Sequence, residues 1–145
     1  MNAKKIAIAS DHAGYNLKEK IIKYLVKEKY QVKDVGTDSE ESVDYPDFGH
    51  LLAKEIETGS YDIGISLCGS GNGINMTVNK HSGIRSALCW NEEISRLARA
   101  HNKANICSLP ARFINYETAI LIVKTFLETK FDGGRHERRI NKIKY

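Results

Sequence analysis

Short apolar runs alternate with longer amphipathic segments along the 145-residue chain, and this alternation most constrains its fold. Five runs have the length and composition of buried strands: residues 5–9, 31–35, 63–67, 85–89 and 105–109. Helices are expected over residues 16–29, 46–58, 92–101 and 115–130, and residues 74–78 can form one or two further turns. Strands that alternate with helices predict a parallel sheet covered on both faces. The expected fold is a three-layer α/β/α, Rossmann-like five-stranded parallel sheet.

The chain has no internal repeat or linker, so we expect residues 1–145 to form one domain, with a short basic helix in residues 131–145. No apolar run approaches the roughly 20 residues of a membrane span. The three cysteines have no CxxC spacing, which argues against disulfides and zinc and for a reducing compartment. The cytoplasm is the expected location.

The formal net charge of +4 is too modest and too dispersed to favour nucleic-acid binding. One basic cluster lies near the C-terminus, within residues 135–144. A few arginines that converge on one small phosphate fit this pattern.

The strand at residues 63–67 ends in the loop Cys68-Gly69-Ser70-Gly71-Asn72-Gly73, before the helical turns of residues 74–78. A strand, a glycine-rich turn and a helix start bring several backbone N–H groups onto one anion. The loop lacks the GK[ST] ending of a P-loop and is GxGxG rather than GxGxxG. A plain βα turn is the alternative. The thiol at the first position favours a reaction site, because a helix N-terminus stabilises a thiolate.

Ligands of such sheets bind beyond the carboxyl ends of the strands. If the first and third strands are neighbours, Asp11 and His12 face the loop of residues 68–73 across one crevice. His101 ends a helix, where the dipole stabilises an imidazolium and makes it a credible proton donor.

The remaining histidines and cysteines are expected to have no chemical role. His50 and His81 have no partner in the sequence and are expected to be solvated. Cys89 and Cys107 lie in apolar strands and are expected to be structural. With no HxxxH or HxH pair, acid–base use of histidine is favoured over metal binding, and no metal or cofactor is expected.

Five motifs in chain order carry a resemblance to a known family: Ser10-Asp11-His12-Ala13-Gly14, Asp44-Tyr45-Pro46-Asp47, the loop of residues 68–73, His101-Asn102 with Ala104-Asn105, and Gly133-Gly134-Arg135-His136-Glu137-Arg138-Arg139. Together they resemble the type B ribose-5-phosphate isomerase family, whose relatives include galactose- and allose-6-phosphate isomerases. The resemblance implies a metal-free aldose–ketose isomerase that acts on a sugar phosphate as a homodimer or a dimer of dimers.

The resemblance also implies roles for individual residues. Cys68 matches the base that takes the C2 proton, and His101 matches the group that opens the furanose ring. The loop glycines with Asn72 match the N–H groups that hold the enediolate oxyanion: Gly69, Gly71, Asn72 and Gly73. Sugar contacts are matched by Asp11, His12, Tyr45 and Asn102. Phosphate contacts are matched by Arg112, Arg135 and Arg139.

The chain departs from the family pattern at a few positions. Ser70 replaces a common threonine and keeps the hydroxyl, so it is grouped with the catalytic residues. Asn72, Asn75, Thr77 and Lys103 are also substitutions, and Pro110-Ala111 replace glycines before Arg112. A six-carbon sugar phosphate therefore remains an alternative substrate to ribose 5-phosphate. A non-catalytic sugar-phosphate-binding module is a further alternative, although such a module gains nothing from Cys68.

The helix at residues 92–101 leaves the crevice edge and, at 1.5 Å per residue, carries His101 to the opposite edge of the sheet. Cys68 and His101 can then act on one sugar only if two chains share each site. The sequence therefore predicts a two-fold dimer with active sites shared between chains.

Overall fold

The computed structural model describes residues 4–143 and contains one five-stranded parallel sheet in the order β2-β1-β3-β5-β4. The strands are β1 (Lys5–Ser10), β2 (Gln31–Gly36), β3 (Ile63–Cys68), β4 (Ser86–Leu88) and β5 (Ile106–Pro110). β3 lies at the centre, between β1 and β5, and all six of its residues are buried. The predicted contact between the first and third strands is confirmed.

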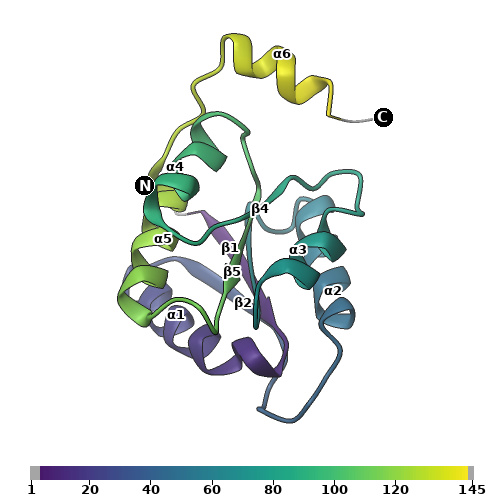
Figure 1. The fold of residues 1–145 in the computed structure, drawn as a ribbon, viewed down its shortest axis with the longest axis vertical. Helices are drawn as coiled ribbons and strands as arrows, with labels where there is room; N and C mark the ends of the chain where they lie inside the picture. Colours follow the sequence, from purple (N-terminus) through teal and green to yellow (C-terminus); the bar gives the residue numbers. More distant parts are fainter. Residues whose placement is uncertain (1–3, 144–145) are drawn as a thin grey trace.

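Helices cover both faces of the sheet, which confirms the predicted α/β fold (Figure 1). The helices are η1 (His12–Gly14), α1 (Tyr15–Lys27), α2 (Tyr45–Glu57), α3 (Asn72–Val78), α4 (Glu92–Ala100), α5 (Tyr116–Glu128) and α6 (Arg135–Asn141). On one face α1, α4 and α5 pack on alternate strand residues such as Ile8, Ile65 and Leu109. On the other face α2 and α3 pack on Ala7, Ala9 and Ile106.

Local sequence explains where three of these helices begin. Asn91 and Asn115 cap α4 and α5, since their side chains accept hydrogen bonds from the N–H groups of Ile94 and Thr118. Asp11 caps η1 in the same way, through the N–H groups of Ala13 and Gly14. The bounds of β1–β5 and α1–α5 differ from the predicted ones by at most two residues, as is usual at element ends. α6 covers only Arg135–Asn141 of the predicted 131–145, of which residues 144–145 lie outside the described residues.

The last helix stands apart from the rest of the ribbon. The chain leaves α5 through an extended segment, and α6 projects beyond the end of the sheet (Figure 1). Only His136 and Ile140, which are four residues apart on one helix face, are buried. Within the described residues, no helix is long and apolar enough to cross a membrane.

Candidate active site

The loop after β3 holds Cys68 against the end of β5. The Cys68 and Gly69 carbonyls accept hydrogen bonds from the N–H groups of Ala111 and Arg112, both at 3.0 Å. The chain then turns at Gly71, which has φ +78° and lies so close to Leu109 and Leu88 that a Cβ would clash with both. α3 starts at Asn72, so its first N–H groups, which have no acceptor within the helix, lie beside the thiol-bearing loop.

Ser70 presents its hydroxyl within this loop. Its Oγ accepts a hydrogen bond from the Asn72 N–H at 3.2 Å. Because this bond uses a lone pair, the hydroxyl proton of Ser70 is left to donate to a bound anion.

Asp11 and His12 lie across from the loop, as the sequence predicted. The Asp11 N–H donates to the Leu67 carbonyl at 3.2 Å, and one carboxylate oxygen caps η1. The His12 Nδ1 accepts a hydrogen bond from the Val43 N–H at 3.1 Å. The neutral tautomer of His12 therefore carries its proton on Nε2 and can donate it to a ligand oxygen.

Two further side chains complete this side of the site. The ring of Tyr45 lies over Gly73, where an added Cβ would be 2.5 Å from the ring. The guanidinium of Arg112 lies over Gly69, with Nη1 3.1 Å from the position of a Cβ. We call the following set the carboxyl-edge group: Asp11, His12, Tyr45, Cys68, Gly69, Ser70, Gly71, Asn72, Gly73 and Arg112.

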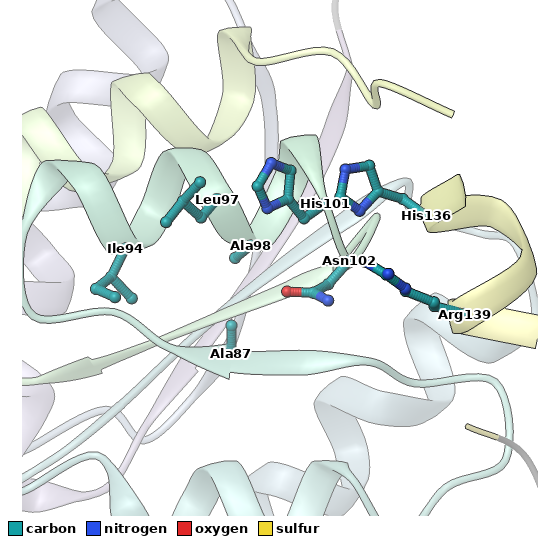
Figure 2. Close-up of a pocket in the computed structure, with 8 residues that line it drawn as sticks. All are labelled: Ala87, Ile94, Leu97, Ala98, His101, Asn102, His136 and Arg139. Carbon is teal, nitrogen blue, oxygen red and sulfur yellow. The ribbon is translucent and has the colours of Figure 1, made fainter. Parts of the chain in front are cut away.

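The other four predicted residues gather at the opposite edge of the sheet, and we call them the amino-edge group: His101, Asn102, Arg135 and Arg139. His101 follows the last residue of α4, and the Asn102 carbonyl accepts a hydrogen bond from Arg85, which precedes β4. A cavity of about 420 Å³ opens here, lined by His101, Asn102 and Arg139 among others (Figure 2).

The two groups are too far apart to act together within one chain. Cys68 pairs with Pro110 at the end of β5, whereas the amino-edge group adjoins the residues before Ile106. At about 3.3 Å per residue, the length of β5 alone separates them by about 16 Å. α4 is one residue shorter than predicted and rises by about 13 Å, but it runs in the predicted direction.

Sequence reasoning gave no role to His136, although it lies within the Gly133–Arg139 motif. Its ring stacks on that of His101, with centroids 4.1 Å apart and planes 10° apart. The pKa of His136 is lowered by burial and, to a lesser degree, by the neighbouring His101. The neutral imidazole is therefore favoured near neutral pH. The sequence signal that could have indicated His136 was its place between Arg135 and Arg139 in this motif.

A candidate metal-binding cluster also lies here, where spacing within the sequence indicated none. His101, Asp132 and His136 each offer one ligand atom, and these atoms lie within 4.8 Å of one another. The sequence spacing did not indicate the cluster because its members come from the residue after α4, the segment after α5, and α6.

His50 is exposed, as expected, whereas His81 is partly buried, and the two histidines contact each other. His50 Nδ1 lies 2.7 Å from His81 Nε2, and His81 Nδ1 lies 2.8 Å from a Glu57 oxygen. The hydrogen bonds from His81 and from the Gly83 N–H lower the pKa of Glu57. His50 and Glu57 lie two turns apart on one face of α2, so only the packing of the α3–β4 loop against α2 brings the three together.

Cys107 in β5 and Cys89 directly after β4 are fully buried, as predicted. Burial and the adjacent Cys89 thiol raise the pKa of Cys107 well above its ordinary value. Neither thiol belongs to the carboxyl-edge group, so Cys68 is the thiol placed at the candidate site.

The fold and the thiol-bearing loop define an α/β protein whose candidate site lies at the carboxyl edge of its sheet. The family model described as Ribose/Galactose Isomerase matches residues 6–143. The chain belongs to this family, which confirms the resemblance seen in the motifs.

Named relatives cover almost the whole chain. Ribose-5-phosphate isomerase B of Escherichia coli is 39% identical over 140 residues, which are 97% of this chain and 94% of the relative. The crystal structure of a ribose 5-phosphate isomerase from Thermotoga maritima has a TM-score of 0.97 and 54% identity, with 99% of each chain covered. The enzyme from Mycoplasma genitalium, solved with bound ribulose-5-phosphate, has a TM-score of 0.92 and 42% identity, covering 96% of this chain and 93% of that one.

Proposed function

We propose that this protein interconverts ribose 5-phosphate and ribulose 5-phosphate by proton transfer through an enediolate. The observation that carries the proposal is Cys68 at the end of a fully buried strand, beside a glycine loop and the start of α3. The names of the Escherichia coli and Mycoplasma genitalium relatives support the choice of substrate.

In this reaction the Cys68 thiolate removes the proton from C2 of the open-chain aldose and returns it to C1. The proton of the C2 hydroxyl passes to O1, so the C1 carbonyl becomes a hydroxyl and the C2 hydroxyl becomes the carbonyl of the ketose. Negative charge develops on the oxygens between these steps. The loop N–H groups and the Ser70 hydroxyl are placed to stabilise that charge, which is larger in the transition state than in the bound substrate.

The substrate phosphate is assigned to the arginines. A phosphate dianion beside Cys68 would oppose formation of the thiolate, so the reacting carbonyl rather than the phosphate belongs at the loop. Arg112 lies at the loop and Arg139 lines the amino-edge cavity, so they can hold one phosphate only if two chains meet.

We therefore propose a homodimer, or a dimer of dimers, in which the amino-edge group of one chain completes the carboxyl-edge group of the other. The large exposed side chains around the Cys68 loop support this arrangement. Met76 of α3, Trp90 after β4 and Phe113 after β5 are 65%, 52% and 76% exposed. His101 from the partner would open the furanose ring at the site that contains Cys68.

The rest of the proposal concerns the chain as a whole. Residues 1–145 act as one domain and need neither metal nor cofactor, and the protein works in the cytoplasm without nucleic acid. The three cysteines, all free and buried, fit a reducing compartment.

One assay tests the proposal. The purified protein is given ribose 5-phosphate, allose 6-phosphate and galactose 6-phosphate, and kcat/KM is measured for each. We expect the highest value on ribose 5-phosphate. A higher kcat/KM on a six-carbon sugar phosphate would show that this sugar, and not ribose 5-phosphate, is the substrate. Binding without turnover of any of the three would indicate a binding module.

A further inference from the structure

Three potential metal ligands meet beside the amino-edge cavity. His101 follows α4, Asp132 lies in the segment after α5, and His136 is in the first turn of α6. The Asp132 N–H donates to the Ala100 carbonyl at 2.9 Å, which fixes the backbone of Asp132 beside His101. Figure 2 shows the rings of His101 and His136 side by side at the cavity.

The potential ligand atoms of this cluster do not hydrogen-bond to one another. The two imidazoles stack face to face with a centroid distance of 4.1 Å. His101 Nε2 and Asp132 Oδ2 are 3.8 Å apart, which is too long for a hydrogen bond. An ion pair of this length between partly exposed groups contributes little to stability.

The donor set selects the kind of ion. Two imidazole nitrogens and one carboxylate oxygen suit Zn²⁺ and its first-row neighbours, whereas Mg²⁺ and Ca²⁺ prefer oxygen ligands alone. Tetrahedral zinc with bonds of about 2.1 Å needs ligand atoms about 3.4 Å apart. The ligand atoms, which lie within 4.8 Å of one another, must therefore approach, and one of the two stacked rings must turn because an imidazole binds a metal in its own ring plane. The Asp132 side chain is 57% exposed and free to turn inward, and water can take the fourth position.

Nearby positive charge limits the affinity. Arg139 lines the same cavity, and Arg135 is adjacent to His136 in the chain. Both repel a divalent cation, so the expected dissociation constant is micromolar rather than that of a structural zinc.

We propose that His101, Asp132 and His136 form a low-affinity Zn²⁺ site whose occupation inhibits the enzyme. Zinc would take the His101 lone pair that proton transfer in ring opening requires. The inhibition rests on the proposed function, whereas the binding of metal does not.

The test measures binding and inhibition separately on the full-length protein. Co²⁺ is titrated without substrate and followed by its visible absorption, and Zn²⁺ binding is followed by calorimetry. The test variant is Asp132→Asn, which removes a ligand without changing a residue assigned to the reaction. The matched control is His50→Gln, which breaks the other histidine pair, His50 with His81.

Wild type and His50→Gln should share the tetrahedral Co²⁺ spectrum and the same Zn²⁺ inhibition, reversible by chelator. Asp132→Asn should bind at least tenfold more weakly. Its Zn²⁺ concentration for half inhibition should rise by the same factor, measured against its own metal-free rate.

Two results would overturn the proposal: inhibition of Asp132→Asn at the wild-type Zn²⁺ concentration, or loss of the Co²⁺ spectrum in Cys68→Ala, which would assign the metal to the thiol. If the protein had no isomerase activity, the Co²⁺ titration of Asp132→Asn would still decide whether this metal site exists. Failure of the proposed function is thereby distinguished from failure of the metal site.

Discussion

At the scale of single residues, the surroundings of each side chain distinguish the proposed base, Cys68, from the other two thiols. Cys107 lies within β5 and Cys89 directly follows β4, and both are fully buried. Cys68 ends its strand, where the backbone leaves the sheet for the glycine loop. The same side chain thus packs in the core at two positions and is proposed to act as a base at the third.

Replacement of this one thiol should abolish most of the activity. Cys68→Ala should lower kcat on ribose 5-phosphate by about a thousandfold or more with little change in KM, because proton removal needs the base and binding does not. Steady-state kinetics measures both constants. Cys107→Ala is the matched control and should keep kcat within a few fold. Near-normal turnover by Cys68→Ala would show that another group is the base.

At the scale of elements, the loop between β3 and α3 depends on backbone that only glycine tolerates. Gly71 and Gly59 have the same φ of +78°, but their surroundings differ. A Cβ at Gly71 would lie 2.5 Å from Leu88 and 3.0 Å from the Leu109 backbone, whereas a Cβ at Gly59 would meet nothing within 4 Å. Comparing substitutions at these two glycines therefore separates the strain of a left-handed backbone from the effect of close packing.

Gly71→Ala should therefore lower the free energy of unfolding by about 2–4 kcal/mol, from backbone strain plus overpacking. It should also lower kcat, since the loop must move. Gly59→Ala should cost only the strain, about 1 kcal/mol, and leave kcat unchanged. Urea unfolding and kinetics on both variants check this. Equal losses in the two variants would mean that the loop can adapt without cost.

The docking of α6 should depend on pH through His136. Around this imidazole lie His101, Arg135 and Arg139, which lower its pKa after burial, and Asp132, which opposes them. Because the folded pKa is below the unfolded value of about 6.5, the full stability is present above pH 6.5. It is lost as the pH falls toward the folded pKa.

Amide hydrogen exchange along α6 should therefore speed up, after correction for intrinsic rates, as the pH is lowered below about 6.5. His136→Asn has no titrating ring and should show a flat profile. A profile in wild type that matches the variant would assign the pH response to another group.

At the scale of the whole molecule, each chain carries its two groups of candidate site residues on opposite edges of one sheet. Parallel strands require the crossover helices to run back, so the start of α4 lies at the Cys68 edge and its end at the other. A two-fold dimer is the smallest closed assembly in which each half meets its complement.

Complementation between two inactive variants tests this arrangement. Cys68→Ala and His101→Ala are mixed in equal amounts, unfolded and refolded, and assayed on a furanose substrate. Half of the dimers are hybrids, and each hybrid has one intact site of two, so about a quarter of wild-type activity should return. Hybrid dimers detected by mass spectrometry without any recovered activity would place both residues in one chain's site.

Sequence alone determined the fold class and the edge of the sheet at which most candidate residues lie, because periodicity and helix caps are local properties. The alternation of residues 63–67 with helical segments was enough for a parallel sheet with Cys68 and Asp11 at one edge. The rise of the helix before His101 was enough to place that residue at the other edge. The motifs of residues 10–14 and 68–73 then indicated the family.

Only the tertiary structure decided which distant groups meet. The place of β5 between β3 and β4 follows from the packing of whole helices, which no local pattern encodes. The His50–His81–Glu57 chain and the cluster of His101, Asp132 and His136 join segments with no regular spacing. Contacts of this kind depend on how elements dock, and docking is set by the total buried surface rather than by any single residue.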